Sequence, residues 1–175
     1  EFFVQLGHSA TVHSTAFSPD GKLIASGGMD HNVKLWSVET GREMRTLQGH
    51  TSYINYITFS PDGRYVASAG HDMTIRLWDP QSGREVRKIT NVLVVRSIAF
   101  GPGGDLLFGN SIGDIAIWNM QTGLVKKLSA ASGVGEVMAI SYSGQGKYIV
   151  AAGKRGFIVV DPQTDKAVRR FGIKE

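Results

Sequence analysis

The sequence predicts an all-β protein, a β-propeller of four blades with four antiparallel strands in each blade. The first observation behind this prediction is a repeat of about 42 residues that runs through the 175-residue chain. The second is a pair of turns, mostly glycine-containing, that recurs in each repeat. The third is an alternation of apolar residues with period 2 between those turns. No segment shows a helical period, and four short strands per repeat are typical of a propeller blade.

Aromatic residues mark the repeat most clearly. One set is spaced by 42, 41 and 42 positions, at Phe17, Phe59, Phe100 and Tyr142. A second set is spaced by 42, 40 and 42 positions, at Trp36, Trp78, Trp118 and Val160. The chain is therefore expected to be one propeller domain, 1–175, with repeats over residues 7–48, 49–90, 91–131 and 132–175.

The turns divide each repeat into strands. The first strand is expected to end at the Phe or Tyr position and to open with an apolar residue, at Val12, Ile54, Val95 and Val137. A tight turn follows, written SPDG twice, then GPGG and SGQG, in which glycine can adopt a positive φ. The second strand is small and apolar, the third alternates, and a further turn leads to the fourth strand.

The first six residues add one strand too many. The segment EFFVQL, residues 1–6, aligns with the fourth strand of the first repeat and predicts an extra outer strand. Three arrangements follow. The chain is part of a larger propeller, or copies self-associate to complete the propeller, or four blades close alone with residues 1–6 displaced. An open array would expose sheet faces and edges that invite association.

The first two repeats combine serine, histidine and aspartate. The stretch SGGMDHNVKLW, residues 26–36, returns as SAGHDMTIRLW, residues 68–78, and a Gly-His pair precedes each copy. These residue types could build hydrolase triads. The duplication, the linked tryptophan and the position of the serine in a strand favour a structural network instead. Aspartate can orient the histidine ring, and the serine can accept the indole N–H.

Taken together, the ordered motifs Gly-His, Ser-Pro-Asp-Gly and Ser…Asp…Leu-Trp resemble the WD-repeat family of β-propellers, in particular the regular repeats of bacterial WD-repeat proteins. The resemblance implies a buried network inside each blade. Its residues here would be His8, Ser26, Asp30, Trp36, His50, Ser68, Asp72 and Trp78. The third and fourth repeats depart from the pattern, with Asn91 and Gly133 at the histidine position and Ile112 and Lys154 at the aspartate position. They are expected to lack the network.

The same resemblance implies a non-catalytic protein-protein interaction scaffold that presents propeller faces to protein or peptide partners, as a module of a larger multidomain protein. Its contacts would lie near the Gly-His loops, at Thr11, His13, Met29, Tyr53, Asn55, His71, Val94, Arg96, Ser111, Glu136, Met138 and Gly153. Tyr53 and Arg96 are of the types that most often dominate binding energy.

Composition limits the alternatives, which are a hydrolase-type enzymatic propeller and a nucleic-acid-binding propeller. The net charge of +4 points weakly to nucleic acid, but the basic residues recur once per repeat and are expected to be spread out. The chain has 0 Cys, and its 5 His show no zinc spacing, so no metal or other cofactor is expected. No membrane span is expected, and the cysteine count fits a cytoplasmic location.

Overall fold

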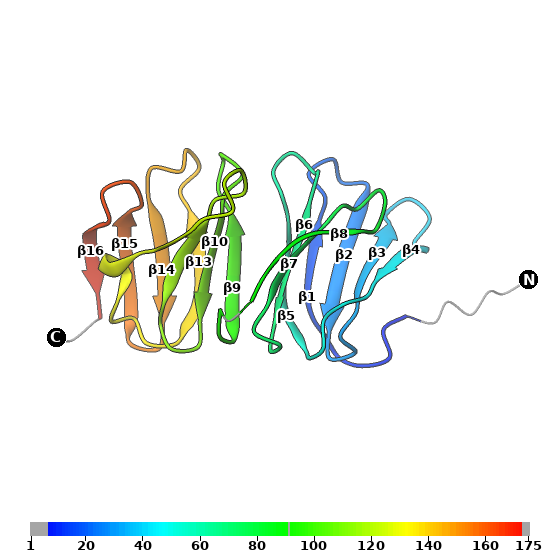
Figure 1. The fold of residues 1–175 in the computed structure, drawn as a ribbon, viewed down its shortest axis with the longest axis horizontal. Helices are drawn as coiled ribbons and strands as arrows, with labels where there is room; N and C mark the ends of the chain where they lie inside the picture. The colour runs from blue at the N-terminus through cyan, green and yellow to red at the C-terminus, as the bar shows by residue number, and fades with distance from the viewer. Residues whose placement is uncertain (1–6, 91, 173–175) are drawn as a thin grey trace, which may run out of the picture. The chain divides into compact units, whose positions relative to one another are not determined.

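The computed structural model describes residues 7–90 and 92–172, which form four antiparallel sheets of four strands each (Figure 1). This confirms the predicted all-β class and the four blades of four strands, each of which is an open sheet. The chain divides into two compact units, unit 1 (Glu1–Val92) and unit 2 (Leu93–Glu175), described separately below. The expected extra strand, residues 1–6, lies outside the described residues.

Each blade is an antiparallel meander in chain order. Blade 1 contains β1 (Val12–Phe17), β2 (Leu23–Gly28), β3 (Val33–Ser37) and β4 (Glu43–Leu47). Blade 2 contains β5 (Ile54–Phe59), β6 (Val66–Gly70), β7 (Ile75–Trp78) and β8 (Glu85–Ile89).

Unit 2 repeats this order. Blade 3 contains β9 (Val95–Phe100), β10 (Leu106–Asn110), β11 (Ile115–Trp118) and β12 (Val125–Lys127). Blade 4 contains β13 (Val137–Tyr142), β14 (Ile149–Gly153), β15 (Gly156–Asp161) and β16 (Lys166–Phe171). A single 3-10 turn, η1 (Ser129–Ala131), joins the two blades, and no helix among the described residues is long and apolar enough to span a membrane.

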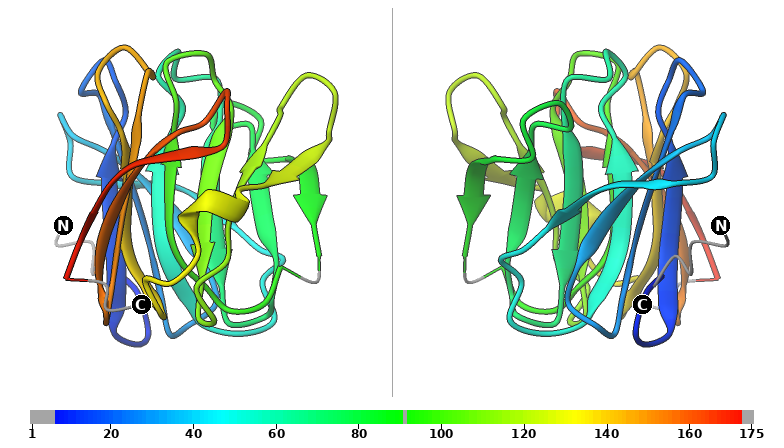
Figure 2. Two further views of the ribbon diagram at one scale, coloured as in Figure 1. Left: turned by 90° about the vertical axis from the view of Figure 1, so that its left-hand side faces the viewer. Right: turned by 90° about the vertical axis from the view of Figure 1, so that its right-hand side faces the viewer.

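The strands twist strongly within each sheet. Figure 2 shows the outermost strands β4 and β16 crossing the inner strands of their own sheets at a steep angle. The Ser-Pro-Asp-Gly turn at 18–21 explains the tight β1–β2 connection. Gly21 adopts a φ of 70°, and its N–H donates to the Ser18 carbonyl at 2.9 Å. The Ser18 hydroxyl also donates to Asp20 at 2.6 Å, so the side chains fix the turn.

The first strand of every blade contains a β-bulge immediately after its opening apolar residue. The pairing register shifts between Val12 and Ser14 in blade 1, and it shifts at the same place in the other three blades. At a bulge, two residues of one strand face a single residue of the neighbouring strand, and the bulged strand bends locally. The four bulged residues are His13, Asn55, Arg96 and Met138.

Within each unit, two blades pack face to face through an apolar core. In unit 1, Ile54 and Ile57 of β5 share a buried cluster with Val33 and Leu35 of blade 1. Gly27 lies so close to Ile57 that an added Cβ would stand 2.5 Å from the isoleucine Cδ1. A side chain at this position would therefore require Ile57 to shift.

Backbone register corrects the sequence alignment of the fourth repeat by one residue. Gly153 pairs with Val137 as Gly28 pairs with Val12. The position of Met29 is therefore taken by Lys154 rather than by Gly153, and the position of Asp30 by Arg155 rather than by Lys154. The residue that this repeat lacks falls later, inside the β14–β15 hairpin, where spacing alone gave no reference point.

Candidate interaction face

Two polar networks hold the Gly-His ends of the blades in unit 1. In blade 1, His8 Nδ1 lies 2.8 Å from Asp30 Oδ2, and His8 Nε2 lies 2.6 Å from Ser26 Oγ. The Trp36 indole N–H donates to the same serine oxygen at 2.7 Å. Because the carboxylate accepts from Nδ1–H, the neutral ring has Nε2 free to accept the serine O–H. The network therefore connects four side chains from β2, β3 and the two loops beside them.

Blade 2 repeats the network at greater depth. His50 lies 2.8 Å from Asp72 Oδ2 and 2.7 Å from Ser68 Oγ, and the Trp78 N–H donates to Ser68 at 2.8 Å. Burial alone would raise the pKa of Asp72, but hydrogen bonds from His50 and Thr74 outweigh it and hold that pKa well below its usual range. The charged carboxylate is thus stabilised inside the blade.

The geometry gives these serines a structural task. Ser68 is 0% exposed, and its oxygen accepts the indole N–H of Trp78 while it contacts the His50 ring. A substrate carbonyl could not approach a hydroxyl placed in this way, whereas a nucleophilic serine must reach its substrate. The arrangement therefore fastens the loops at the Gly-His end to the strands beneath them.

Unit 2 has apolar residues at the serine position. Strand pairing places Phe108 of β10 and Ala151 of β14 where Ser26 and Ser68 stand in unit 1. The indole N–H of Trp118 is consequently buried without a hydrogen-bond partner among the described residues. One position that would correspond to a histidine, Asn91, lies outside those residues.

Six residues expected to bind partners lie at the Gly-His end of unit 1. Backbone hydrogen bonds join four of them in pairs. Met29 N–H donates to the Thr11 carbonyl at 2.9 Å, and His71 N–H donates to the Tyr53 carbonyl at 2.8 Å. The bulged residues His13 and Asn55 are the other two members of this group. The unit 1 face, as named here, consists of Thr11, His13, Met29, Tyr53, Asn55 and His71.

An aromatic cluster stands at the centre of the unit 1 face. The Tyr53 ring lies 5.6 Å from the ring of His31 and 6.0 Å from that of His71, centroid to centroid. Tyr53 keeps 40% of its surface exposed. Sequence reasoning missed His31, which adopts a φ of 66° directly after Asp30 in the β2–β3 hairpin. The sequence signal that could have identified His31 is its position directly after Asp30, the aspartate of the network.

The corresponding unit 2 face consists of Val94, Arg96, Ser111, Glu136 and Met138. Ser111 N–H donates to the Val94 carbonyl at 2.9 Å, as in unit 1. Arg96 Nε lies 2.8 Å from Glu136 Oε1, and Lys154 Nζ lies 2.5 Å from Oε2 of the same carboxylate. Lys154 and then Arg96 lower the pKa of Glu136.

The ion pair between Arg96 and Glu136 therefore joins blades 3 and 4. The spacing of residues within the repeats could not predict this contact. Met138 and Ile112 of unit 2 are exposed apolar side chains.

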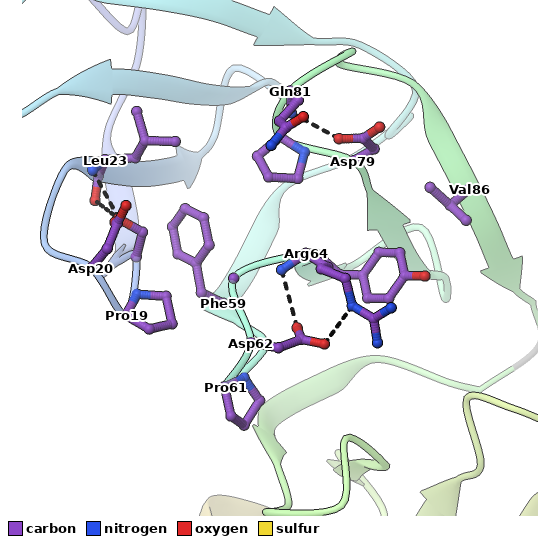
Figure 3. A pocket seen from close by; sticks show the side chains of 14 residues that line it. Pro19, Asp20, Leu23, Phe59, Pro61, Asp62, Arg64, Asp79, Gln81 and Val86 are labelled. Atoms are coloured by element: carbon purple, nitrogen blue, oxygen red, sulfur yellow. Dashed lines mark hydrogen bonds and ion pairs between the residues drawn. The ribbon is translucent and has the colours of Figure 1, made fainter.

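The opposite end of unit 1 contains a groove of about 710 Å³ (Figure 3). Both Ser-Pro-Asp-Gly turns and the turn after β7 line it, with Phe59 and Leu23 among its apolar residues. Its charged groups are bonded within their own turns. Asp62 lies 2.6 Å from Arg64 Nε, and Asp79 accepts the Gln81 N–H at 2.8 Å. The groove was not foreseen from the sequence.

No cluster of three or more histidine, aspartate, glutamate or cysteine side chains suited to a metal ion occurs in the part of the chain that the structure describes.

Comparison with known proteins identifies the first two repeats. Residues 2–37 and 41–79 match the protein family described as WD domain, G-beta repeat. All eight network residues of blades 1 and 2 lie within these two matched stretches. Unit 2 lies outside the matched residues, in keeping with its lost network residues.

Several curated relatives match short stretches of the chain. A ribosome biogenesis protein BOP1 homolog of Drosophila virilis is 42% identical over 48 residues, 27% of this chain and 6% of that protein. A periodic tryptophan protein 2 homolog of Dictyostelium discoideum is 49% identical over 37 residues, 21% of this chain and 4% of that protein. Ribosome assembly protein 4 of Chaetomium thermophilum is 51% identical over 37 residues, 21% of this chain and 7% of that protein.

The chain therefore spans only a small part of the length of these curated relatives. The matched segments are about as long as one repeat. All three relatives come from eukaryotes, so they give no support to the expected likeness to bacterial proteins.

Proposed function

We propose that the chain is a non-catalytic interaction scaffold that binds a protein or peptide partner through the unit 1 face, as a module of a larger cytoplasmic protein. The observation that carries this proposal is the exposed Tyr53 ring between His31 and His71. Tyrosine combines a large apolar ring with a polar hydroxyl, and it is enriched among the residues that dominate binding energy.

Rigidity of the unit 1 face supports the same role. Backbone hydrogen bonds and the two buried networks hold the loops beneath Tyr53, so a partner meets a surface that is ordered in advance. Binding to such a surface costs little conformational entropy. The match of both blades to WD repeats also favours a scaffold.

The enzymatic alternative is disfavoured by the burial of the serines in both networks. The nucleic-acid alternative is weakened at the unit 2 face because Glu136 pairs with both Arg96 and Lys154 and so offsets part of their positive charge. Two of the named relatives carry names that refer to ribosome biogenesis or assembly. Each of these matches is about one repeat long. We therefore propose for this chain only a scaffold role, and not a part in ribosome biogenesis or assembly.

The proposal is tested by quantitative affinity purification from cells that express the protein, using the wild-type chain, Tyr53→Ala and Tyr65→Ala. Tyr65 is the control because it lines the groove at the opposite end of unit 1. We expect a set of partners whose recovery falls at least tenfold with Tyr53→Ala and is unchanged with Tyr65→Ala. Equal recovery with Tyr53→Ala, from protein that melts normally, would show that this face does not bind the partner.

A further inference from the structure

The groove at the end of unit 1 opposite the unit 1 face lies where blades 1 and 2 meet. Three turns line it, the β1–β2 turn of blade 1 and the β5–β6 and β7–β8 turns of blade 2 (Figure 3). Leu23 of blade 1 and Phe59 of blade 2 line it and pack in the apolar cluster that the two blades share. An added Cβ on Gly83, in the β7–β8 turn, would stand 3.3 Å from Arg45 Cδ of blade 1. The groove is therefore formed inside unit 1, at the contact between its two blades.

The three turns that line the groove are rigid. Each contains a proline, whose ring fixes φ, at Pro19, Pro61 and Pro80. In each turn a serine hydroxyl also donates to an aspartate carboxylate, from Ser18 to Asp20 at 2.6 Å, from Ser60 to Asp62 at 2.6 Å and from Ser82 to Asp79 at 2.8 Å. A ligand therefore meets a groove whose shape is set in advance, which lowers the entropic cost of binding.

Carboxylates outnumber cations in the lining of this groove. Asp20, Asp62 and Asp79 line it, and the one cation among the lining residues is Arg64. Arg64 Nε lies 2.6 Å from Asp62 Oδ2, so its charge is offset by that carboxylate. Asp20 and Asp79 form no ion pair within the described part of the chain. The positive charges that act on them at longer range are those of Lys22 and Arg45, respectively.

Asp20 and Asp79 are charged at neutral pH and keep capacity for a ligand. The Ser18 hydroxyl lowers the pKa of Asp20, and the Ser82 hydroxyl lowers the pKa of Asp79. Both hydrogen bonds that Asp20 accepts in its turn go to Oδ1, so Oδ2 can accept from a bound group. These two carboxylates therefore add negative charge beside an apolar floor.

Unit 2 has a groove of about 510 Å³ at its corresponding turns, without this acidic lining. Gly103 and Gln145 stand where the turns of unit 1 have Asp20 and Asp62. The charged residues that line the unit 2 groove are one carboxylate, Asp105, and one ammonium, Lys126. The excess of carboxylates is therefore specific to the unit 1 groove, although the whole chain has a net charge of +4.

We propose that the unit 1 groove binds a linear peptide segment that places an apolar side chain over Phe59 and a neighbouring lysine or arginine beside Asp20 and Asp79. Cationic side chains donate strong, charge-assisted hydrogen bonds to carboxylates. The groove volume of about 710 Å³ is of the size that holds a few side chains of a ligand. This site is separate from the unit 1 face and goes beyond the partner binding proposed there.

Selection of a random hexapeptide library, displayed on phage, on the 175-residue chain tests the proposal. We expect enrichment of peptides in which arginine or lysine is next to an apolar residue. The most enriched peptide is then synthesised with a fluorescent label, and its dissociation constant is measured by fluorescence polarisation. A selection without enrichment of basic residues would overturn the proposal.

Two double variants with the same change in net charge locate the bound peptide. Asp20→Asn with Asp79→Asn removes both carboxylates of the site, and binding is expected to weaken roughly fivefold or more, as for the loss of two surface charge pairs. Asn119 of blade 3 stands at the position of Asp79 and makes the same backbone bonds, so such a turn accepts asparagine. The control, Asp105→Asn with Asp161→Asn, removes two carboxylates from turns of unit 2 and should bind as wild type does.

Two single variants complete the test. Arg64→Gln removes the one cation of the lining, so binding of the basic peptide is expected to tighten. Its side chain is 74% exposed, and a cooperative melt verifies that this variant and the others fold. Tyr53→Ala, at the opposite end of unit 1, should leave binding unchanged. Equal binding by the Asp20 and Asp79 double variant, weaker binding by Arg64→Gln, or loss of binding with Tyr53→Ala would each overturn the proposal.

Discussion

The serine hydroxyl joins the histidine to the tryptophan in each polar network. In blade 2 it contacts the His50 ring and accepts the Trp78 N–H at the same time. Unit 2 shows what happens without it, because Trp118 there has no acceptor for its buried N–H among the described residues. A buried polar group left unpaired costs about 1–3 kcal/mol.

Ser68→Ala is expected to lower the free energy of unfolding by about 1–3 kcal/mol, because His50 and Trp78 would lose their shared partner in a buried site. Ser26→Ala is the matched variant. Its loss is expected to be smaller, because Trp36 is only half-buried and water can reach it. Urea unfolding of both variants measures the difference, and an equal or larger loss for Ser26→Ala would contradict this reasoning.

The residues of these networks could be selected from sequence because the first two repeats duplicate them. Contacts that arise only from the folded structure could not be predicted in this way. Arg96 shows this most directly, since its ion pair with Glu136 joins two blades and has no spacing signature. His31 is similar, because its ring contact with Tyr53 depends on the positive φ that the hairpin imposes.

At the scale of elements, apolar alternation placed the strands but not their irregularities. The predicted openings at Val12, Ile54, Val95 and Val137 are the first residues of β1, β5, β9 and β13. The bulge that follows each of them was not foreseen, because a bulged residue can be either apolar or polar and so leaves no pattern in the sequence. Polar residues at three of the four bulges, His13, Asn55 and Arg96, were recognised only through family resemblance.

The last turn of blade 4 has an unexpected role in fixing the η1 turn. Asp165 stands where earlier repeats have glycine and adopts a φ of 51°. Its carboxylate accepts the N–H of Ser129 at 3.0 Å and that of Ala130 at 3.1 Å. Arg170 donates to the carbonyls of Ala130 and Ser132 in the same segment. The turn thus ties the connection between the blades to blade 4.

Asp165→Gly is expected to speed amide hydrogen exchange at Ser129 and Ala130 by roughly tenfold, because glycine keeps the positive φ but removes the acceptor, worth about 1 kcal/mol or more. Asp165→Asn retains an acceptor oxygen and should show a smaller change. Exchange measured by mass spectrometry resolves this segment. Unchanged exchange in Asp165→Gly would mean that the carboxylate does not hold η1.

At the scale of the whole molecule, periodicity predicted the four blades and left their closure open. Closure depends on the angle between neighbouring blades, and that angle depends on the volumes of the side chains packed between the blades rather than on the repeat length. These side chains differ between the units: Ile54 and Ile57 pack against blade 1 in unit 1, whereas Val137 and Ile140 pack against blade 3 in unit 2. A constant repeat length is therefore compatible with different packing between the blades, and closure could not be predicted from the period.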